Sequence, residues 1–242
     1  MLRSLPTKRT LFFSKSAAFT ADPRNAVYLC NPTSASFTAT LPAVAQSQGV
    51  TLSFKIEANL SIGSNTVTID GNASETIDNA LTLVLYMAGD AVSLYCDGSK
   101  WVVVASSIQK HKAQMVRAAS QGIPVTMETL VLLDSETYDN GGIADPTTGK
   151  FTVRRAGRHR LGAAWHCSQV VNGNMSTRLY HNTTRVADTN IYGINSTPTA
   201  TIDVVAVAGD TFELRIYQEG TNPTLNTSTG VSLRPRMQVQ EL

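Results

Sequence analysis

Charged residues are scarce in this 242-residue chain, in which Asp, Glu, Lys and Arg together make up 16%. An ordinary soluble domain has about 25%. Small and mildly polar residues fill the difference, so the composition is not that of a disordered, highly charged chain. The net charge of +2 is too small to indicate nucleic acid as a partner. So little ionic surface is tolerable when partner subunits cover much of it, which favours self-association.

Cysteine is scarce too, and Cys30, Cys96 and Cys167 form no close pair. This odd, dispersed set excludes a CxxC metal or redox site and argues against a disulfide framework, so we expect buried free thiols. Long apolar runs are also missing. No stretch approaches the roughly 18 apolar residues of a membrane span, so we expect no insertion into a membrane.

Sequence signatures of catalysis are absent, since the chain has no GxSxG, HExxH or Walker loop. Its four histidines, His111, His159, His166 and His181, are dispersed and do not have the spacing of a metal site. A metal on a threefold axis, held by His159 or His166 from each of three chains, is a minor alternative. We therefore expect no enzyme, no metal and no cofactor.

Short strand patterns dominate the first half. They are rich in Val, Thr, Ile, Leu and Tyr and are bounded by Gly, Asn, Asp or Pro. In the run 65–69, Val67 and Ile69 alternate with threonines, which predicts one buried and one exposed face. The expected strands are 26–30, 36–41, 50–56, 65–69, 81–87, 91–96 and 100–105, with hairpin turns at 88–90 and 97–100. A small β module is therefore predicted over residues 26–106.

The segment 107–122 interrupts this pattern. It is basic and lacks β alternation, so we expect a linker or short helix there. The strand signals then resume, and they predict an antiparallel sandwich or jelly roll over residues 123–242. The expected strands are 129–134, 150–155, 159–171, 175–181, 184–192, 199–207, 211–217 and 231–239. The predicted fold class is all-β throughout.

The second half also contains an ordered set of glycine-bearing turns. A loop at 138–142 precedes Gly149-Lys150-Phe151, Gly157 opens the next strand, and the run 208–210 (Ala-Gly-Asp) precedes a Phe-bearing strand. Over residues 123–242 this set resembles the globular head of complement and the tumour-necrosis-factor-like jelly rolls. Members of that family are trimers that pack the inner faces of three jelly rolls around a threefold axis.

The resemblance implies a homotrimer. The uncharged strand after Gly157 would then be buried between chains, with small residues where neighbours approach and aromatic residues filling a shared core. The candidate trimer-interface residues are Leu161, Ala163, Trp165, Phe151, Phe212 and Leu214. Packing of the same side chains inside one sandwich is the alternative.

Three runs in the first half follow one another in a recognisable order. They are Thr40-Leu41-Pro42, the run 65–71 (Asn-Thr-Val-Thr-Ile-Asp-Gly) and the run 97–101 (Asp-Gly-Ser-Lys-Trp). This order resembles a small β module that recurs in bacteriophage fibre and appendage proteins. The resemblance implies a place on a virion surface.

The N-terminal segment 1–25 is basic and has no acidic residue before Asp22. In composition it is similar to a transit peptide, but its apolar stretch is too short for a secretory signal. We expect it to be an anchoring arm that docks on an acidic surface of another virion protein, in the capsid or the tail. The candidate docking residues are Arg3, Lys8, Arg9, Phe12 and Phe13.

Basic residues cluster around Gly157. Arginine binds acidic glycans or phosphates by paired hydrogen bonds, although such a cluster is more often a solvated rim or pairs with acids on the next subunit. Polar loops near residues 172–174, 193–198 and 218–229 are the natural places for a host-surface glycan or protein. The candidate ligand-contact or rim residues are Arg154, Arg155, Arg158, Arg160, Asn172, Asn174 and Asn195.

Together these features predict a non-enzymatic, trimeric protein on the surface of a tailed bacteriophage. Its N-terminal part would hold it to the particle, and its C-terminal knob would serve host attachment as a short fibre or receptor-binding appendage. A capsid-decorating, cement or head-fibre trimer is the near alternative. A cellular lectin-like ligand and a glycan depolymerase are distant ones, the latter needing a carboxylate pair in a groove.

Overall fold

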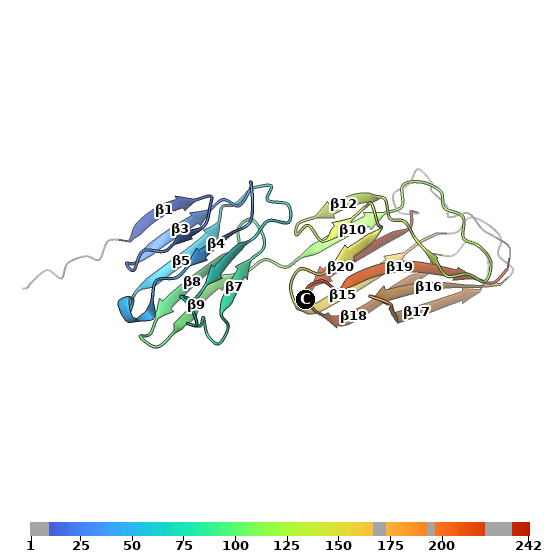
Figure 1. Ribbon diagram of the computed structural model, residues 1–242. Coiled ribbons are helices and arrows are strands. Elements are labelled where there is room, and N and C mark those ends of the chain that lie inside the picture. Colours follow the sequence, from blue (N-terminus) through green and yellow to red (C-terminus); the bar gives the residue numbers. More distant parts are fainter. Residues whose placement is uncertain (1–9, 167–172, 193–196, 221–233) are drawn as a thin grey trace, which may run out of the picture. The chain divides into compact units, whose positions relative to one another are not determined.

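The structure is a computed structural model that describes residues 10–166, 173–192, 197–220 and 234–242 (Figure 1). Within these ranges every regular element is a β-strand except one short 3-10 helix, η1 (Val44–Gln46), so the all-β prediction is confirmed. None of the described residues forms a helix long and apolar enough to cross a bilayer. The chain divides into two compact units, Met1–Gln109 and Lys110–Leu242.

In unit 1 the chain winds between two sheets of mostly parallel strands, and we call each pass through both sheets a coil. Its strands are β1 (Leu11–Lys15), β2 (Phe19–Thr20), β3 (Ala26–Cys30), β4 (Phe37–Thr40), β5 (Thr51–Ile56), β6 (Val67–Asp70), β7 (Thr82–Leu85), β8 (Ala91–Cys96) and β9 (Trp101–Ser107). The first six alternate between two sheets, β7 follows β6 in the same sheet, and β8 and β9 lie together in the other. The sheet orders are β1-β3-β5-β8-β9 and β2-β4-β6-β7. Strands β1, β3 and β5 pair in parallel, as do β2, β4 and β6, whereas β7, β8 and β9 join antiparallel.

The core of unit 1 lies between these two sheets. Val67 and Ile69 are fully buried in it, as the alternation in 65–69 predicts. Cys30 and Cys96 are buried free thiols, which confirms that expectation for two of the three cysteines. Burial raises the pKa of the Cys30 thiol to about 12. Cys167 lies outside the described residues.

Two turns of unit 1 show how pairing departs from local pattern. The turn at 97–100 closes the hairpin between β8 and β9, with Gly98 at φ +95°, as expected for Asp-Gly. The turn at 88–90 also has a left-handed glycine, Gly89 at φ +91°. It carries the chain from β7 in one sheet to β8 in the other, so it is not a hairpin.

The boundary predicted at residue 25 is wrong. Leu11 and Phe13 alternate with the exposed Phe12 and Ser14, and they pack against the core of unit 1. Strand β1 pairs with β3, and β2 pairs with β4. Residues 11–20 are therefore part of the β module, because their strands pair in parallel with β3 and β4 and their apolar residues extend the same core.

Unit 2 is an antiparallel two-sheet sandwich. Its strands are β10 (Lys112–Val116), β11 (Thr129–Leu130), β12 (Ser135–Asp139), β13 (Ala144–Asp145), β14 (Lys150–Thr152), β15 (Gly157–Ala164), β16 (Asn174–His181), β17 (Thr184–Tyr192), β18 (Thr199–Ala206), β19 (Thr211–Gln218) and β20 (Arg236–Glu241). The two sheets have the orders β12-β10-β20-β15-β18 and β13-β14-β19-β16-β17, and β11 joins β19. Without the short strands β11, β12 and β13, this is the strand order of a jelly roll, as predicted.

The linker predicted at 107–122 is wrong, because β10 lies within it. Ala113 and Met115 are fully buried in the core of unit 2, and Lys112 and Gln114 point away from it. Strand β10 pairs with both β12 and β20, so it is an internal strand of its sheet. The strand consists mainly of good helix formers, so local propensity does not indicate a strand here. Pairing with β12 and β20 makes it one.

Candidate interaction surface of unit 2

The outer face of the β12-β10-β20-β15-β18 sheet is almost uncharged at its centre. Side chains alternate along β15, so that Leu161 and Ala163 enter the core whereas Gly162 and Ala164 lie on the outer face. The cross-strand register sets Gln238 and Thr201 on either side of Gly162. We call this surface the uncharged face, and its members are Gln114, Gly162, Ala164, Thr199, Thr201 and Gln238.

A hollow of about 260 Å³ opens on the uncharged face. Its lining consists of the uncharged-face residues together with Ala163 and Arg236. The hollow exists because the central positions of β15 carry almost no side chain. A Cβ atom on Gly162 would lie 3.1 Å from Nε2 of Gln238, so glycine leaves room for that amide.

Charge lies toward both ends of this sheet, with Arg236 lining the hollow beside Ala164 and a paired cluster toward Gly157. The guanidinium of Arg160 donates to both carboxylate oxygens of Asp203, at 2.8 and 3.0 Å, and Arg158 lies 3.6 Å from the same carboxylate. The hydrogen bond from Arg160 lowers the pKa of Asp203. Beside this pair, Val205 and Val207 are 72% and 59% exposed. Apolar surface and paired charge thus border the uncharged centre.

The outer face of the opposite sheet carries dense charge instead. Glu128 accepts from Arg178 and from the Tyr180 hydroxyl at 2.6 Å, and Arg215 lies 3.8 Å away. Burial raises the pKa of Glu128, but the hydrogen bonds from Tyr180 and Arg178 outweigh it and hold that pKa below its usual value. We call this surface the charged face, and its members are Glu128, Lys150, Arg178, Tyr180, Arg185, Asp188, Glu213, Arg215 and Tyr217.

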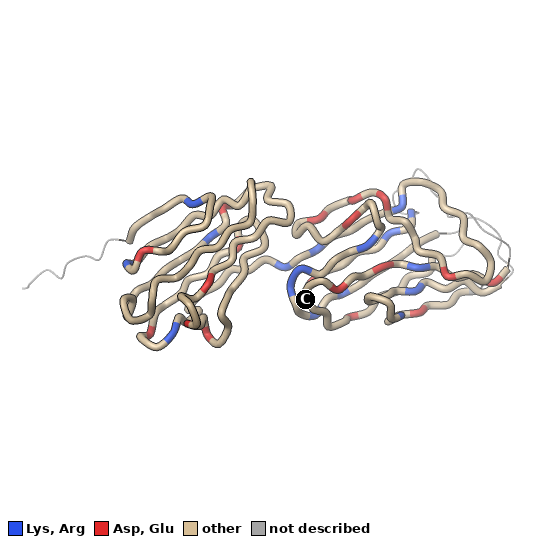
Figure 2. The backbone as a smooth tube through the Cα atoms, viewed as in Figure 1, with Lys and Arg blue, Asp and Glu red and all other residues tan. Residues whose placement is uncertain are grey.

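Stacking and ion pairs tie the charged face together across strands. The guanidinium carbon of Arg178 lies 4.3 Å from the ring centre of Tyr217, and that of Arg215 lies 4.4 Å from the ring centre of Tyr180. Glu213 is buried, and its carboxylate pairs with Lys150 at 2.8 Å and with Arg215 at 2.5 Å. Figure 2 shows blue and red segments, for basic and acidic residues, on the tube of unit 2. Such a network is satisfied within one chain.

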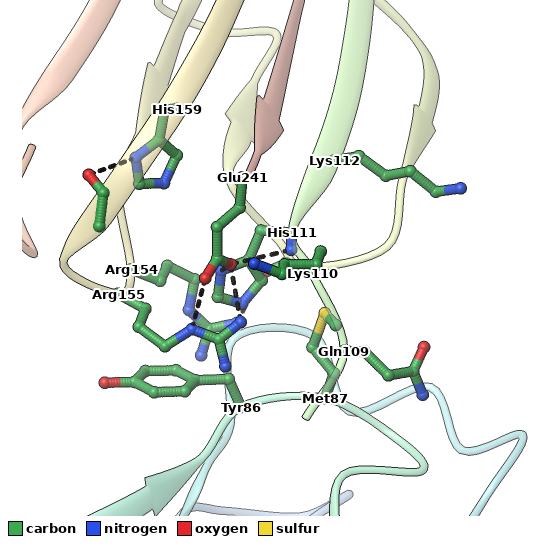
Figure 3. Close-up of polar contacts among 12 residues, drawn as sticks. Tyr86, Met87, Gln109, Lys110, His111, Lys112, Arg154, Arg155, His159 and Glu241 are labelled. Atoms are coloured by element: carbon green, nitrogen blue, oxygen red, sulfur yellow. Dashed lines mark hydrogen bonds and ion pairs between the residues drawn. The ribbon is translucent and has the colours of Figure 1, made fainter. Parts of the chain in front are cut away.

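One end of the sandwich holds a buried polar cluster, shown in Figure 3. Glu241 accepts two hydrogen bonds from Arg155, at 2.7 and 2.9 Å, and one from the backbone amide of His111 at 3.1 Å. Burial opposes ionisation of Glu241, but the bonds from Arg155 and His111 lower its pKa overall. The imidazole of His111 packs over Gly141, where a Cβ atom would lie 2.3 Å from Cδ2.

A second histidine cluster surrounds Phe212. His159 is buried, its Nδ1 lies 3.2 Å from the carbonyl of Gly157, and burial lowers its pKa. His181 lies 2.7 Å from Asp210, and both imidazoles pack on the Phe212 ring. Bonds from the Asn182 side chain, the Val207 amide and His181 lower the pKa of Asp210 to about 2. These contacts tie β15, β16 and β19 together at this end of the sandwich.

The trimer-interface assignment of six residues is wrong. Leu161, Ala163, Trp165, Phe151, Phe212 and Leu214 all lie in the core of unit 2, with at most 6% exposure. The indole Nε1 of Trp165 donates to Thr177 Oγ1 at 2.8 Å inside the same sandwich. Leu161 and Ala163 face inward because strand alternation buries the odd-numbered residues of β15 and leaves the outer face to Gly162 and Ala164. Phe151, Phe212 and Leu214 enter the same core from β14 and β19 of the opposite sheet.

The basic cluster is paired within the chain. Arg154 donates to the Gly141 carbonyl at 2.6 Å and Arg155 to Glu241, while Arg158 and Arg160 share Asp203. The rim interpretation fits these contacts better than a free anion site. Asn174 donates to Glu219 at 3.2 Å, and Asn172 and Asn195 lie outside the described residues.

Of the N-terminal docking candidates, only two are described. Phe12 is 71% exposed, and Phe13 packs partly against the core of unit 1. Arg3, Lys8 and Arg9 lie outside the described ranges. Sequence reasoning missed Gly162 and Ala164 on the uncharged face and Glu128 on the charged face, although strand alternation could have identified the first two.

A metal site on a threefold axis cannot use His159, because its side chain is enclosed in the core. His166 follows β15, and its Nδ1 lies 3.3 Å from Thr197 Oγ1. In the part of the chain that the structure describes, no three His, Cys, Asp or Glu side chains group as metal ligands.

No family model matches this sequence, and no curated protein matches it either. Among solved structures, murine APRIL aligns with 55% of this chain over its full length, at 12% identity and a TM-score of 0.45. The globular domain of the zebrafish complement 1qA protein aligns over 97% of its length with 55% of this chain, at 11% identity and a TM-score of 0.39. TM-scores this low carry no argument, and the jelly roll rests on the strand order itself.

Proposed function

We propose that this chain is a non-enzymatic, homotrimeric structural protein of a tailed bacteriophage particle. Three copies pack the uncharged faces of unit 2 around a threefold axis. Unit 1 is held by another virion protein, and unit 2 is exposed. The observation that carries the proposal is the difference between the two outer faces of one sandwich.

The uncharged face suits burial between chains. Gln, Thr, Gly and Ala can be desolvated at low cost when their amides and hydroxyls find partners, whereas unpaired charges cannot. The small side chains of Gly162 and Ala164 allow close approach of a neighbouring chain. The charged face is satisfied internally and suits contact with water.

Host attachment is the role that we propose for the exposed unit, in a short fibre or receptor-binding appendage. Its support is the resemblance to a knob family used for recognition. The near alternative is a capsid-decorating trimer, which the short connection favours, since only residues 108–111 separate β9 from β10. No long shaft stands between the two units in the sequence.

Two experiments test this proposal. Antibodies against the purified chain, applied to phage particles in electron microscopy, should label the virion at the tail for an appendage or at the head for decoration. Purified full-length chain should slow phage adsorption to the host if it binds the receptor. Head labelling without competition would exclude attachment and retain decoration, whereas unlabelled particles would exclude both.

A further inference from the structure

The first coil of unit 1 ends in an open edge. In the described residues β1 has one strand neighbour, β3, and β2 has one, β4 (Figure 1). Edge strands are usually protected by proline, by bulges or by charge, because their free amides and carbonyls invite another strand. Strand β1 reads Leu-Phe-Phe-Ser-Lys, is free of proline, and pairs with β3 without a bulge.

The backbone of β1 alternates between its partner and the open side. The Leu11 amide donates to Asn25 at 3.0 Å, and the Lys15 carbonyl accepts from Asn31 at 2.8 Å. In a parallel ladder the residues between them, Phe12 and Ser14, direct their N–H and C=O groups away from β3. These groups form a template for one more strand.

The side chains of β1 leave an aromatic ladder unfinished. Phe13, Tyr28 and Phe54 are in register across β1, β3 and β5. Their rings stack at centroid distances of 5.3 and 5.2 Å. Tyr28 and Phe54 are fully covered, but Phe13 is the last ring and is only partly buried. Another aromatic residue on an added strand would continue the ladder.

A hollow of about 200 Å³ lies at this end of the core. Phe13, Lys15, Thr20, Asp22 and Tyr28 line it. The Lys15 ammonium lies 5.7 Å from the Phe13 ring centre and 5.0 Å from that of Phe19. Among the described residues no carboxylate forms an ion pair with Lys15, although Asp22 pairs with Arg24 at 2.5 Å.

We propose that the open edge of β1 accepts an extended segment of an acidic partner protein as an added parallel strand. That segment carries an apolar residue opposite Leu11, an aromatic residue opposite Phe13, and Asp or Glu opposite Lys15. This inference rests on the proposed function, since the partner is the virion protein that holds unit 1. The mode is β-strand addition, in which backbone bonds give affinity and alternate side chains give specificity.

Lys15 determines which segment can pair with β1. An inward-facing lysine at a sheet edge disfavours pairing with most strands, whereas an acidic residue opposite the lysine forms an ion pair with it. A second copy of β1 would have to pair antiparallel about a twofold axis, which sets Lys15 opposite Leu11. The segment 1–9 has no aromatic or acidic residue, and it contains Pro6. The basic sequence up to Arg24 complements an acidic partner.

Labelled peptides that contain Val-Thr-Phe-Thr-Glu, flanked by Ser and Thr, test this on the full-length chain by fluorescence anisotropy. We expect saturable binding, weaker by about tenfold when Lys replaces Glu in the peptide. The chain variant Lys15→Glu should reverse that preference. Amide exchange at Phe12 and Ser14 should slow on binding. Equal binding of both peptides, or the same preference in Lys15→Glu, would overturn the proposal.

Two variants separate edge pairing from other contacts. Ser14→Pro removes an outward amide without a native hydrogen bond and should abolish binding, whereas Ser14→Ala should bind as the unchanged chain does. Binding that appears only after deletion of residues 1–9 would assign the edge to the chain's own N-terminus and contradict the proposal. Because the readout needs neither a trimer nor a particle, its failure is distinct from failure of the proposed function.

Discussion

The two outer faces of unit 2 belong to one sandwich and share one core, yet their surfaces differ. On the charged face, arginines, acids and tyrosines satisfy one another across β16, β17 and β19. On the uncharged face, Gln238 and Thr201 flank Gly162, and the ion pair between Arg160 and Asp203 lies toward the Gly157 end of the sheet. The shared core does not account for the composition of either outer face. In the proposed trimer the charged face contacts water and the uncharged face packs against another chain.

The largest effect should come from the core that both faces share. Trp165→Ala removes a buried ring and its hydrogen bond to Thr177, so the free energy of unfolding of unit 2 should fall by about 3–5 kcal/mol. Chemical denaturation followed by circular dichroism measures this. Tyr138→Ala on the partly exposed strand β12 is the control and should change it by less than about 0.5 kcal/mol. Dissociation of an oligomer without loss of stability would instead place Trp165 at an interface.

A matched pair of charge changes tests the faces directly. Gln238→Glu adds a carboxylate to the uncharged face, where threefold symmetry repeats it, and like charges brought together cost several kcal/mol. The trimer should dissociate in light scattering at micromolar concentration. Asn190→Asp makes the same chemical change on β17 of the opposite sheet and should leave the mass unchanged. Equal behaviour of the two variants would remove the distinction between the faces.

The charged face should respond in stability rather than in mass. Glu128→Gln removes the acid that Arg178 and Arg215 share and leaves each with one other carboxylate, Asp188 and Glu213, which should lower the free energy of unfolding by about 1 kcal/mol at neutral pH. Because the pKa of Glu128 is lowered in the fold, its contribution is present above the unfolded pKa and is lost as pH falls through the folded value. Melts of variant and unchanged chain should therefore converge in acid. A constant difference across pH would contradict this role.

The smallest effect concerns His159. Burial lowers its pKa, so the unfolded chain binds the proton more readily, and stability declines as pH falls below the unfolded pKa of about 6.5. Glu241 opposes this shift, while Arg155 and His181 add to it. His159→Gln should flatten the fall in melting temperature between about pH 7 and pH 5. An unchanged slope would assign the dependence to other groups.

Most strands could be read from the sequence, but strand neighbours could not. The alternation of Val67 and Ile69 predicted a buried face correctly. Nothing local indicates that β3 pairs with β1 and β5 in parallel, because pairing depends on residues far apart in the chain. Strand β10 was missed because its Lys, Ala, Gln and Met residues favour a helix in isolation.

The candidate interface shows the same limit at finer scale. The sequence pointed to the strand after Gly157, and that strand does belong to the sheet with the uncharged face. On this strand the choice of side chains was wrong by one residue, which sends every side chain to the other face. Phe151, Phe212 and Leu214 belong to β14 and β19 of the opposite sheet. Trp165 lies in the core. Gly162 and Ala164, whose small side chains indicate no function in the sequence, lie on the outer face of the sheet.

The mass of the purified, full-length chain tests the assembly most directly. Sedimentation equilibrium at micromolar concentration should give three times the 26.0 kDa of one chain. It should give the single-chain mass for Gln238→Glu and the trimer mass for Asn190→Asp. A single-chain mass for the unchanged protein would show that the uncharged face is a free surface and would contradict the account.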